Sequence, residues 1–247
     1  MKKMFGIEQS LFLPERVAVI GSSPSLMKKE LGSEIDSFQA VFRFNGALTK
    51  GFERNVGSKS DYICLGLDLA YFSNYPFIGP VGNVITTDSP NRYQNSLILK
   101  ALNIDTKFIT WSHEIERASL NRQHENYLHL IACLNSEDVF TWWPEKTEQE
   151  VKDNYQGNRI LEEYDIDPLL CSGKGMRTGF RTVLMLVKSG VKPSLFGFDV
   201  DENIKSARHY YDNFTSDNFD EHTAHDFRGE MAALVELRNK KLITISG

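Results

Sequence analysis

Residues 17–26, VAVIGSSPSL, are a short apolar run followed by a turn of small residues. An unbroken apolar run of this length, bounded by turn residues, is typical of a buried strand. Backbone N–H groups in the turn after it can bind a phosphate at the start of a helix. The dinucleotide fingerprint Gly-x-Gly-x-x-Gly is absent, because Ser23 and Leu26 occupy its second and third glycine positions. The turn therefore fits nucleotide binding, or a plain turn in which Ser22 or Ser23 caps the next helix.

Similar apolar runs bounded by turn residues recur along the chain and predict further strands. The predicted strands are Val17–Gly21, Ala40–Phe44, Tyr62–Leu67, Asn83–Thr87, Lys107–Trp111, Ser194–Phe198 and Leu242–Ile245. Helix-like stretches lie between them, at Asn95–Leu102, Glu114–Ile131, Thr178–Lys188 and Asp226–Lys240. This alternation, without a repeat or a linker, predicts a single α/β domain over residues 1–247 with a mostly parallel central sheet flanked by helices.

Composition excludes several classes of protein. The chain has 247 residues, 41% of them hydrophobic and 25% charged, which fits a compact globule. The net charge of −5 argues against nucleic acid or an anionic membrane surface as the main partner. The cysteines are few and far apart, so neither a disulfide framework nor a zinc site of paired cysteines is expected. No stretch approaches the roughly 20 apolar residues of a transmembrane helix. We expect a cytoplasmic, soluble protein.

A second candidate anion site is the stretch SGKGMRTGF, residues 172–180. It contains Gly-Lys but lacks the leading glycine and the spacing of the phosphate-binding P-loop, so an ATPase is not indicated. Thr178 and Gly179 open an apolar helical stretch, and the N–H groups at that helix start can hold an anion.

Four segments together resemble the motifs of the animal-type sialyltransferases. Val17–Ser60 resembles the large sialyl motif and Met176–Phe198 the small one. HYYDN from His209 resembles the third motif, and His225 followed by Glu230 fits the last. The motifs occur in the family's order, while residues 63–172 match no motif and are expected to govern the choice of acceptor.

The resemblance implies a Rossmann-like fold, the sialyltransferase variant of the GT-A type. It also implies inverting, metal-independent transfer of sialic acid from CMP-sialic acid to a glycan or glycolipid hydroxyl, with no cofactor. Val17 and Gly190 replace the two cysteines that join the large and small motifs in the animal enzymes, as a cytoplasmic, microbial member without a membrane anchor would do. Arg177 and Pro24 also depart from the family pattern. A lipid-linked acceptor would bring the enzyme to a membrane peripherally.

The resemblance also assigns roles to individual residues. It implies that His225 is the general base, since an imidazole with a pKa of about 6.5 can accept the acceptor hydroxyl's proton. It assigns His209 to the CMP phosphate, where a protonated ring would stabilise the leaving charge. Glu230 is expected to support the helix. The predicted contacts with CMP come from Ser22, Ser23, Asn45, Thr178 and Gly179.

Alternatives remain for each of these interpretations. CMP-Kdo shares the leaving group and the anomeric carboxylate of CMP-sialic acid, so a Kdo transferase of surface-polysaccharide or lipopolysaccharide assembly is an alternative. Asn45 fits a simple turn, and His209 a structural histidine. His222 and His225, with Asp212 or Asp220, would form a metal site in a rival interpretation. A non-catalytic nucleotide-sugar-binding module is a further rival.

Trp142 and Trp143 are adjacent tryptophans outside the four motifs. They offer a stacking platform for a sugar ring, and core packing explains them equally well.

Overall fold

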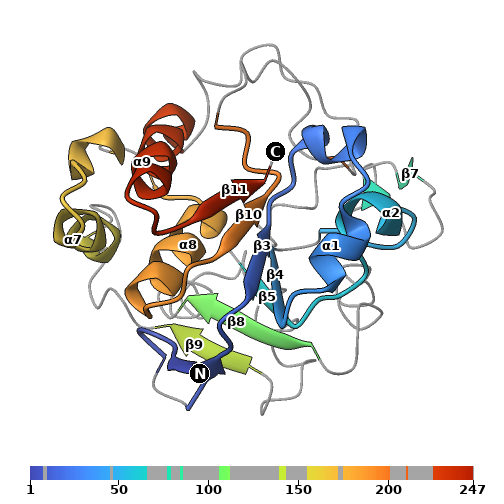
Figure 1. The fold of residues 1–247 in the computed structure, drawn as a ribbon, viewed down its shortest axis with the longest axis horizontal. Helices are drawn as coiled ribbons and strands as arrows, with labels where there is room; N and C mark the ends of the chain where they lie inside the picture. The colour runs from blue at the N-terminus through green and yellow to red at the C-terminus, as the bar shows by residue number, and fades with distance from the viewer. Residues whose placement is uncertain are drawn as a thin grey trace.

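The computed structural model describes residues 1–7, 10–44, 47–65, 77–78, 84–85, 106–111, 139–142, 155–171, 175–200, 210 and 225–246. Its centre is a seven-stranded sheet with the order β11-β10-β3-β4-β5-β8-β9 (Figure 1). Every pair of neighbours in this sheet is parallel. The strands are β3 (Val17–Ile20), β4 (Ala40–Phe44), β5 (Tyr62–Leu65), β8 (Lys107–Trp111), β9 (Val139–Trp142), β10 (Ser194–Phe196) and β11 (Thr244–Ser246).

The order of the strands reverses between β3 and β10. From β3 the chain adds β4, β5, β8 and β9 on one side, and then returns to place β10 and β11 on the other side of β3. In open α/β sheets, ligands bind outside the carboxyl ends of the strands at such a reversal. A ligand site is therefore expected at the turns that follow β3 and β10.

The side chains of β3 alternate between two hydrophobic cores. Val17 and Val19 belong to one buried cluster, and Ala18 and Ile20 to the other. A strand that is buried on both faces carries an unbroken apolar run, and this is why VAVI contains no polar residue. The sheet therefore forms the middle layer of three.

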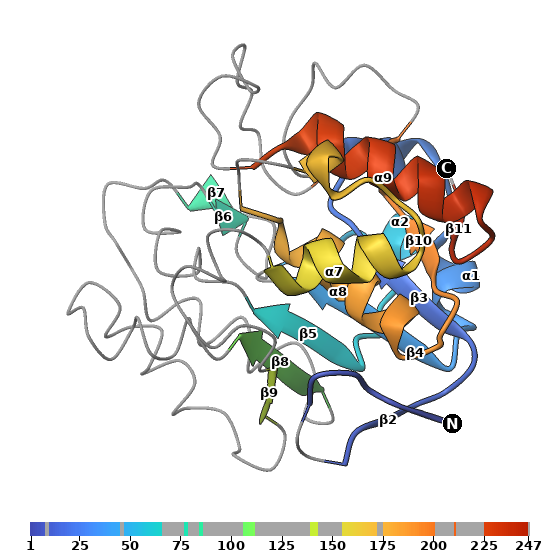
Figure 2. The same ribbon diagram turned by 90° about the vertical axis from the view of Figure 1, so that its left-hand side faces the viewer.

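The helices form the two outer layers. One face is covered by α7 (Tyr155–Glu163), α8 (Thr178–Lys188) and α9 (Phe227–Asn239), and Figure 2 shows these three helices together on that side. The other face carries the 3-10 helix η1 (Pro24–Lys28) with α1 (Gly32–Asp36) and α2 (Glu53–Val56) (Figure 1).

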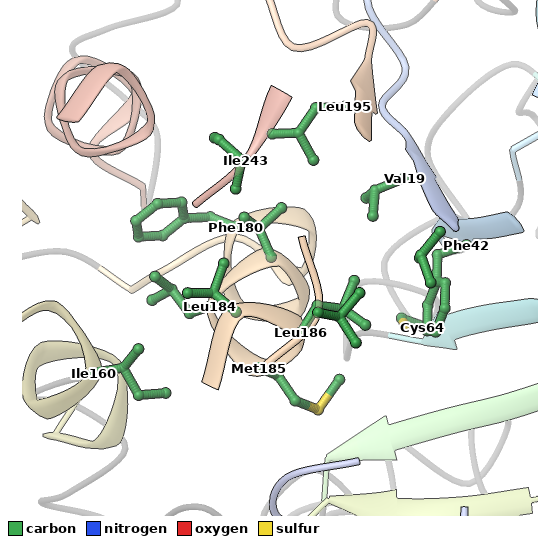
Figure 3. Close-up of a cluster of buried hydrophobic side chains, with 14 of the residues drawn as sticks. Val19, Phe42, Cys64, Ile160, Phe180, Leu184, Met185, Leu186, Leu195 and Ile243 are labelled. Carbon is green, nitrogen blue, oxygen red and sulfur yellow. The ribbon is translucent and has the colours of Figure 1, made fainter. Parts of the chain in front are cut away.

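Helix α8 is the centre of the larger core. All its residues from Phe180 to Val187 are buried. They pack against β3, β4 and β10 on one side and against α7 on the other (Figure 3). Apart from Arg181 and Thr182 this stretch is apolar, as expected of a helix that is enclosed on most sides. This packing fixes where the first residues of α8 lie.

Most of the strands predicted from the sequence are confirmed within a few residues. Asn83–Thr87 contains β7 (Val84–Ile85), which pairs antiparallel with β6 (Phe77–Ile78) outside the central sheet. Strand β9 and the hairpin of β1 (Lys2–Lys3) and β2 (Phe12–Leu13) were not predicted. The predicted helices Asn95–Leu102 and Glu114–Ile131 lie outside the described residues. No helix within the described ranges is both long and apolar enough to cross a bilayer.

Helix α7 was missed because its sequence favours a helix only weakly. YQGNRILEE contains Gly157 and Asn158, both poor helix formers. A Cβ on Gly157 would lie 2.4 Å from the sulfur of Met176, so the glycine permits close packing against the segment before α8. Tertiary packing thus outweighs local propensity here.

Candidate active site

The turns after β3 and β10 lie against each other at the reversal of the strand order. The N–H of Gly21 donates to the carbonyl of Phe196 at 2.7 Å. A Cβ on Gly21 would lie 2.3 Å from the carbonyl oxygen of Gly197, and Gly197 itself has a φ of +69°. Only glycines allow these two backbones to come so close.

A carboxylate from the second turn holds the first. The hydroxyls of Ser23 and Ser25 both donate to Asp199, which lies just beyond β10. The Ser23 oxygen also accepts from the N–H of Ser25 at 3.1 Å and so caps η1. The capping interpretation of Ser23 is therefore confirmed, while contact of Ser22 or Ser23 with a donor stays a prediction.

Tyr210 joins the third motif to the same turn. Its N–H donates to the carbonyl of Ser22 at 2.8 Å, and its hydroxyl donates to the carbonyl of Leu48. The side chain is only 8% exposed, and this burial raises the pKa of Tyr210 to about 12, although the positive charge of Arg43 acts in the opposite direction. The chain neighbour of His209 is thus fixed beside the first turn. His209 itself and Asn45 lie outside the described residues, so their roles stay predictions.

The start of α8 lies over the ends of β4 and β10. A Cβ on Gly179 would be 3.5 Å from the ring of Phe44 and 3.6 Å from that of Phe198. These two rings meet edge to face, 6.5 Å apart. Arg177 occupies the N-cap position in an extended conformation and gives no side-chain capping bond. Thr178 and Gly179 therefore stand at the carboxyl edge of the sheet, as the predicted anion site requires.

His225 stands two residues before α9. Its Nδ1 lies 2.5 Å from the carbonyl oxygen of Gly175. A carbonyl oxygen only accepts, so Nδ1 carries the proton and the neutral ring has its lone pair on Nε2. The next residue, Asp226, caps α9 by accepting from the N–H of Gly229 at 2.9 Å. The helix cap and the Gly175 bond together orient a ring that can accept a proton at Nε2.

Glu230 connects α9 to the start of α8. It is 1% exposed, accepts from the N–H of Arg177 at 2.7 Å and forms an ion pair with the guanidinium of the same residue. Its described contacts are with this supporting segment, as expected of a residue that holds the helix in place.

Two residues of the large motif are structural. The buried Arg43 of β4 donates from Nε to the carbonyl of Lys59 and the hydroxyl of Ser60, each at 2.9 Å, and from Nη2 to the carbonyl of Val56 at 2.7 Å. Burial lowers the pKa of Arg43. Asp36 binds the same loop from α1. Part of the motif's pattern is therefore explained by the loop that leads into β5.

Several predicted features lie outside the described residues. His222, Asp212 and Asp220 belong to this group, so the metal-site rival is left as it stood. Among the described residues, no group of three or more His, Cys, Asp or Glu side chains could hold a metal ion. Trp142 ends β9, the edge strand of the sheet, and Trp143 is not described.

Asp199 and Tyr210 are the site residues that the sequence did not reveal. The resemblance to the small motif ended at Phe198, one residue before Asp199. A carboxyl group directly after a strand of a parallel sheet is a signal that would have identified it, because the ends of neighbouring strands meet at one edge.

The first quarter of the chain is similar in sequence to known proteins. Residues 14–78 match the model of glycosyltransferase family 29 (sialyltransferase). The chain is 38% identical over 72 residues to bovine beta-galactoside alpha-2,6-sialyltransferase 2, a match that covers 28% of this chain and 14% of that protein. It is 51% identical over 45 residues to human beta-galactoside alpha-2,6-sialyltransferase 1, over 18% of this chain and 11% of that protein. These matches span less than a fifth of the relatives' length.

The fold is similar to that of a solved mammalian sialyltransferase in complex with Gal-beta-1-3GalNAc-ortho-nitrophenol. The TM-score is 0.56 at 19% identity, over 94% of this chain and 69% of that one. The Rossmann-like α/β architecture predicted from the sequence is thereby confirmed. Residues 14–78, which match the family model, include β3, the serine turn and the Arg43 loop described above. Residues 14–78 are thus similar to glycosyltransferase family 29, the sialyltransferase family, and the chain is similar in fold to a solved member of that class of enzyme.

Proposed function

We propose that the protein is an inverting, metal-independent glycosyltransferase that moves sialic acid from CMP-sialic acid to a glycan hydroxyl, with His225 as the general base. The similarity of residues 14–78 to the sialyltransferase family supports the reaction class. The observation that carries the assignment of the base is the bond between His225 Nδ1 and the Gly175 carbonyl, which leaves the lone pair of the neutral ring on Nε2. A base needs such a lone pair, and a fixed direction for it, when it removes the acceptor's proton.

The donor is proposed to bind where the strand order reverses. Three features lie at this reversal. They are the serine turn held by Asp199, the start of α8, whose N-cap residue gives no side-chain capping bond, and Tyr210, which is bound to Ser22. A helix start stabilises the negative charge of a phosphate. His209 directly precedes Tyr210, and this supports its proposed role at the CMP phosphate, where a cationic ring would stabilise the leaving group.

A cytoplasmic location is also proposed. Val17, which stands in place of one family cysteine, is buried in β3, and Gly190, in place of the other, has a φ of +75°. An L-residue is strained in that conformation, so the position has adapted to glycine rather than to a bridging cysteine. Fractionation of the source cells with an antibody tests this, and recovery outside the cytoplasm would contradict it.

The division of labour between the two histidines tests the proposed function. His225→Ala should lower turnover about 10²–10⁴-fold with CMP affinity nearly unchanged, since a base facing the acceptor hardly touches the nucleotide. His209→Ala should lower both turnover and the affinity for CMP. Transfer assays with CMP-sialic acid and CMP-Kdo, together with CMP titrations in EDTA, measure these effects.

Each result that differs from these expectations contradicts a different part of the proposed function. Indistinguishable variants would contradict the two roles. Loss of CMP binding in EDTA would favour a metal-dependent enzyme, and transfer of Kdo alone would replace the donor. Full activity of His225→Ala in the biological assay would indicate a non-catalytic binding module.

A further inference from the structure

The segment that precedes α8 is attached to the start of α9 at several points. Gly175 accepts the Nδ1–H of His225, and the N–H of Arg177 donates to Glu230. The Arg177 guanidinium donates from Nε to the same carboxylate and lies over the ring of Phe227, 4.0 Å from its centroid. Residues 175–177 and the first turn of α9 therefore form one interlocked unit.

Phe227 lies between the guanidinium and the imidazole. Arg177 covers the face of the Phe227 ring, while the ring of His225 meets it edge to face at 6.5 Å. Cation–π contact and the ion pair act on the same planar group, so Arg177 is held in one orientation. Glu230 is almost completely buried, and a buried carboxylate requires such a partner.

In the motif that this segment resembles, a serine is usual at the position of Arg177. A serine reaches neither the face of Phe227 nor the far oxygen of Glu230. The carbonyl that fixes the proton of His225 lies only two residues before Arg177. The contacts that hold Arg177 in place therefore also hold the Gly175 carbonyl, which accepts from His225.

We propose that Arg177 is a positioning residue for His225. It binds Glu230 and Phe227, keeps the Gly175 carbonyl on Nδ1, and so maintains the tautomer with its lone pair on Nε2. Its effect on catalysis rests on the proposed function of His225, whereas its effect on the tautomer does not. Nuclear magnetic resonance of ¹⁵N-labelled histidine reads the tautomer directly, and the spectrum of His225→Gln identifies the signal of His225.

Four variants make the test specific. Arg177→Ser should move the neutral ring away from the Nδ1–H form and lower kcat about 10–100-fold, with the KM for the donor within about twofold, because a small misplacement of a reacting group has an effect of this size. Arg177→Lys and Glu230→Gln should show intermediate tautomer populations, since each keeps part of the contacts. Arg54→Ser removes an arginine from the exposed pair with Glu30 on the other face of the sheet, and should change nothing.

The outcomes separate the inference from the proposed function. Circular dichroism first establishes that each variant is folded. A folded Arg177→Ser or Arg177→Lys with the wild-type Nδ1–H signal would overturn the inference, whatever the activity. If the tautomer changes but the wild-type protein transfers no CMP-sugar, the inference holds and the proposed function fails.

Discussion

Asp36 binds three donors of the loop that follows α2. Its carboxylate accepts from the N–H and the hydroxyl of Ser58 at 3.0 and 2.9 Å, and from the N–H of Lys59 at 2.9 Å. Partial burial raises the pKa of Asp36, but the hydrogen bonds from Lys59 and Ser58 outweigh it, so the pKa of this carboxyl lies below its ordinary value. Ionised Asp36 therefore stabilises the fold at pH values above the pKa that its carboxyl has in the unfolded chain. This contribution is lost as the pH falls through the lower pKa that the carboxyl has in the folded protein.

Asp36→Asn should accordingly destabilise the protein in a pH-dependent way. At pH 7 we expect a loss of about 1.5–3 kcal/mol, the usual range for hydrogen bonds to a charged group. The difference from the wild-type protein should shrink as the pH falls through and below the unfolded value of about 3.9. Urea unfolding at several pH values measures it, with the exposed Glu34→Gln on the same helix as the control. A difference that is constant with pH would contradict the role of the charge.

At the scale of elements, Gly229 determines how closely α9 packs on the 3-10 helix η5 (Pro168–Cys171). A Cβ at this position would lie 1.5 Å from the carbonyl oxygen of Leu170. The obstacle is backbone, so the two elements must separate to accept a methyl group. Gly229→Ala should therefore lower the free energy of unfolding by about 1–3 kcal/mol, the usual cost of overpacking.

Gly179→Ala is the matched control, because its Cβ would meet Phe44 and Phe198 at ordinary contact distances. Its stability should be unchanged or higher by up to about 1 kcal/mol, since alanine favours a helix over glycine. Thermal unfolding of both variants checks the pair. Equal stabilities of the two variants would show that η5 can move away from α9 at little cost in free energy.

Prediction from the sequence succeeded where the pattern was local. The run VAVI and the helix beginning at Thr178 carry their own signals in apolar residues and turn chemistry, and both formed where expected. Asp199 binds serines that lie 174 and 176 residues earlier in the chain, and the hydroxyl of Tyr210 binds the carbonyl of Leu48, 162 residues away. No local pattern encodes contacts at such separations, so these residues emerged only from the structure.

At the scale of the whole molecule, the proposed donor site combines the turn after β3 with segments near and after β10. A ligand bound there should therefore stabilise the whole fold against unfolding. CMP at about 100 times its Kd should add about 2.7 kcal/mol to the free energy of unfolding, if it binds only the folded chain. UMP and ADP at the same concentration should add much less, and EDTA should not diminish the effect of CMP. Thermal unfolding with each nucleotide measures this. Equal stabilisation by ADP would contradict a CMP-specific site.

The pairing of β3 with β10 has a consequence for how the protein folds. β3 begins at Val17 and β10 at Ser194, and the chain must close a very long loop before these strands can meet. Loop closure costs entropy before any contact repays it, and proteins dominated by such distant pairings fold slowly. The two turns at the carboxyl edge have no partners until that closure occurs. The candidate active site therefore cannot form ahead of the global topology, and a nascent chain that lacks β10 cannot assemble it.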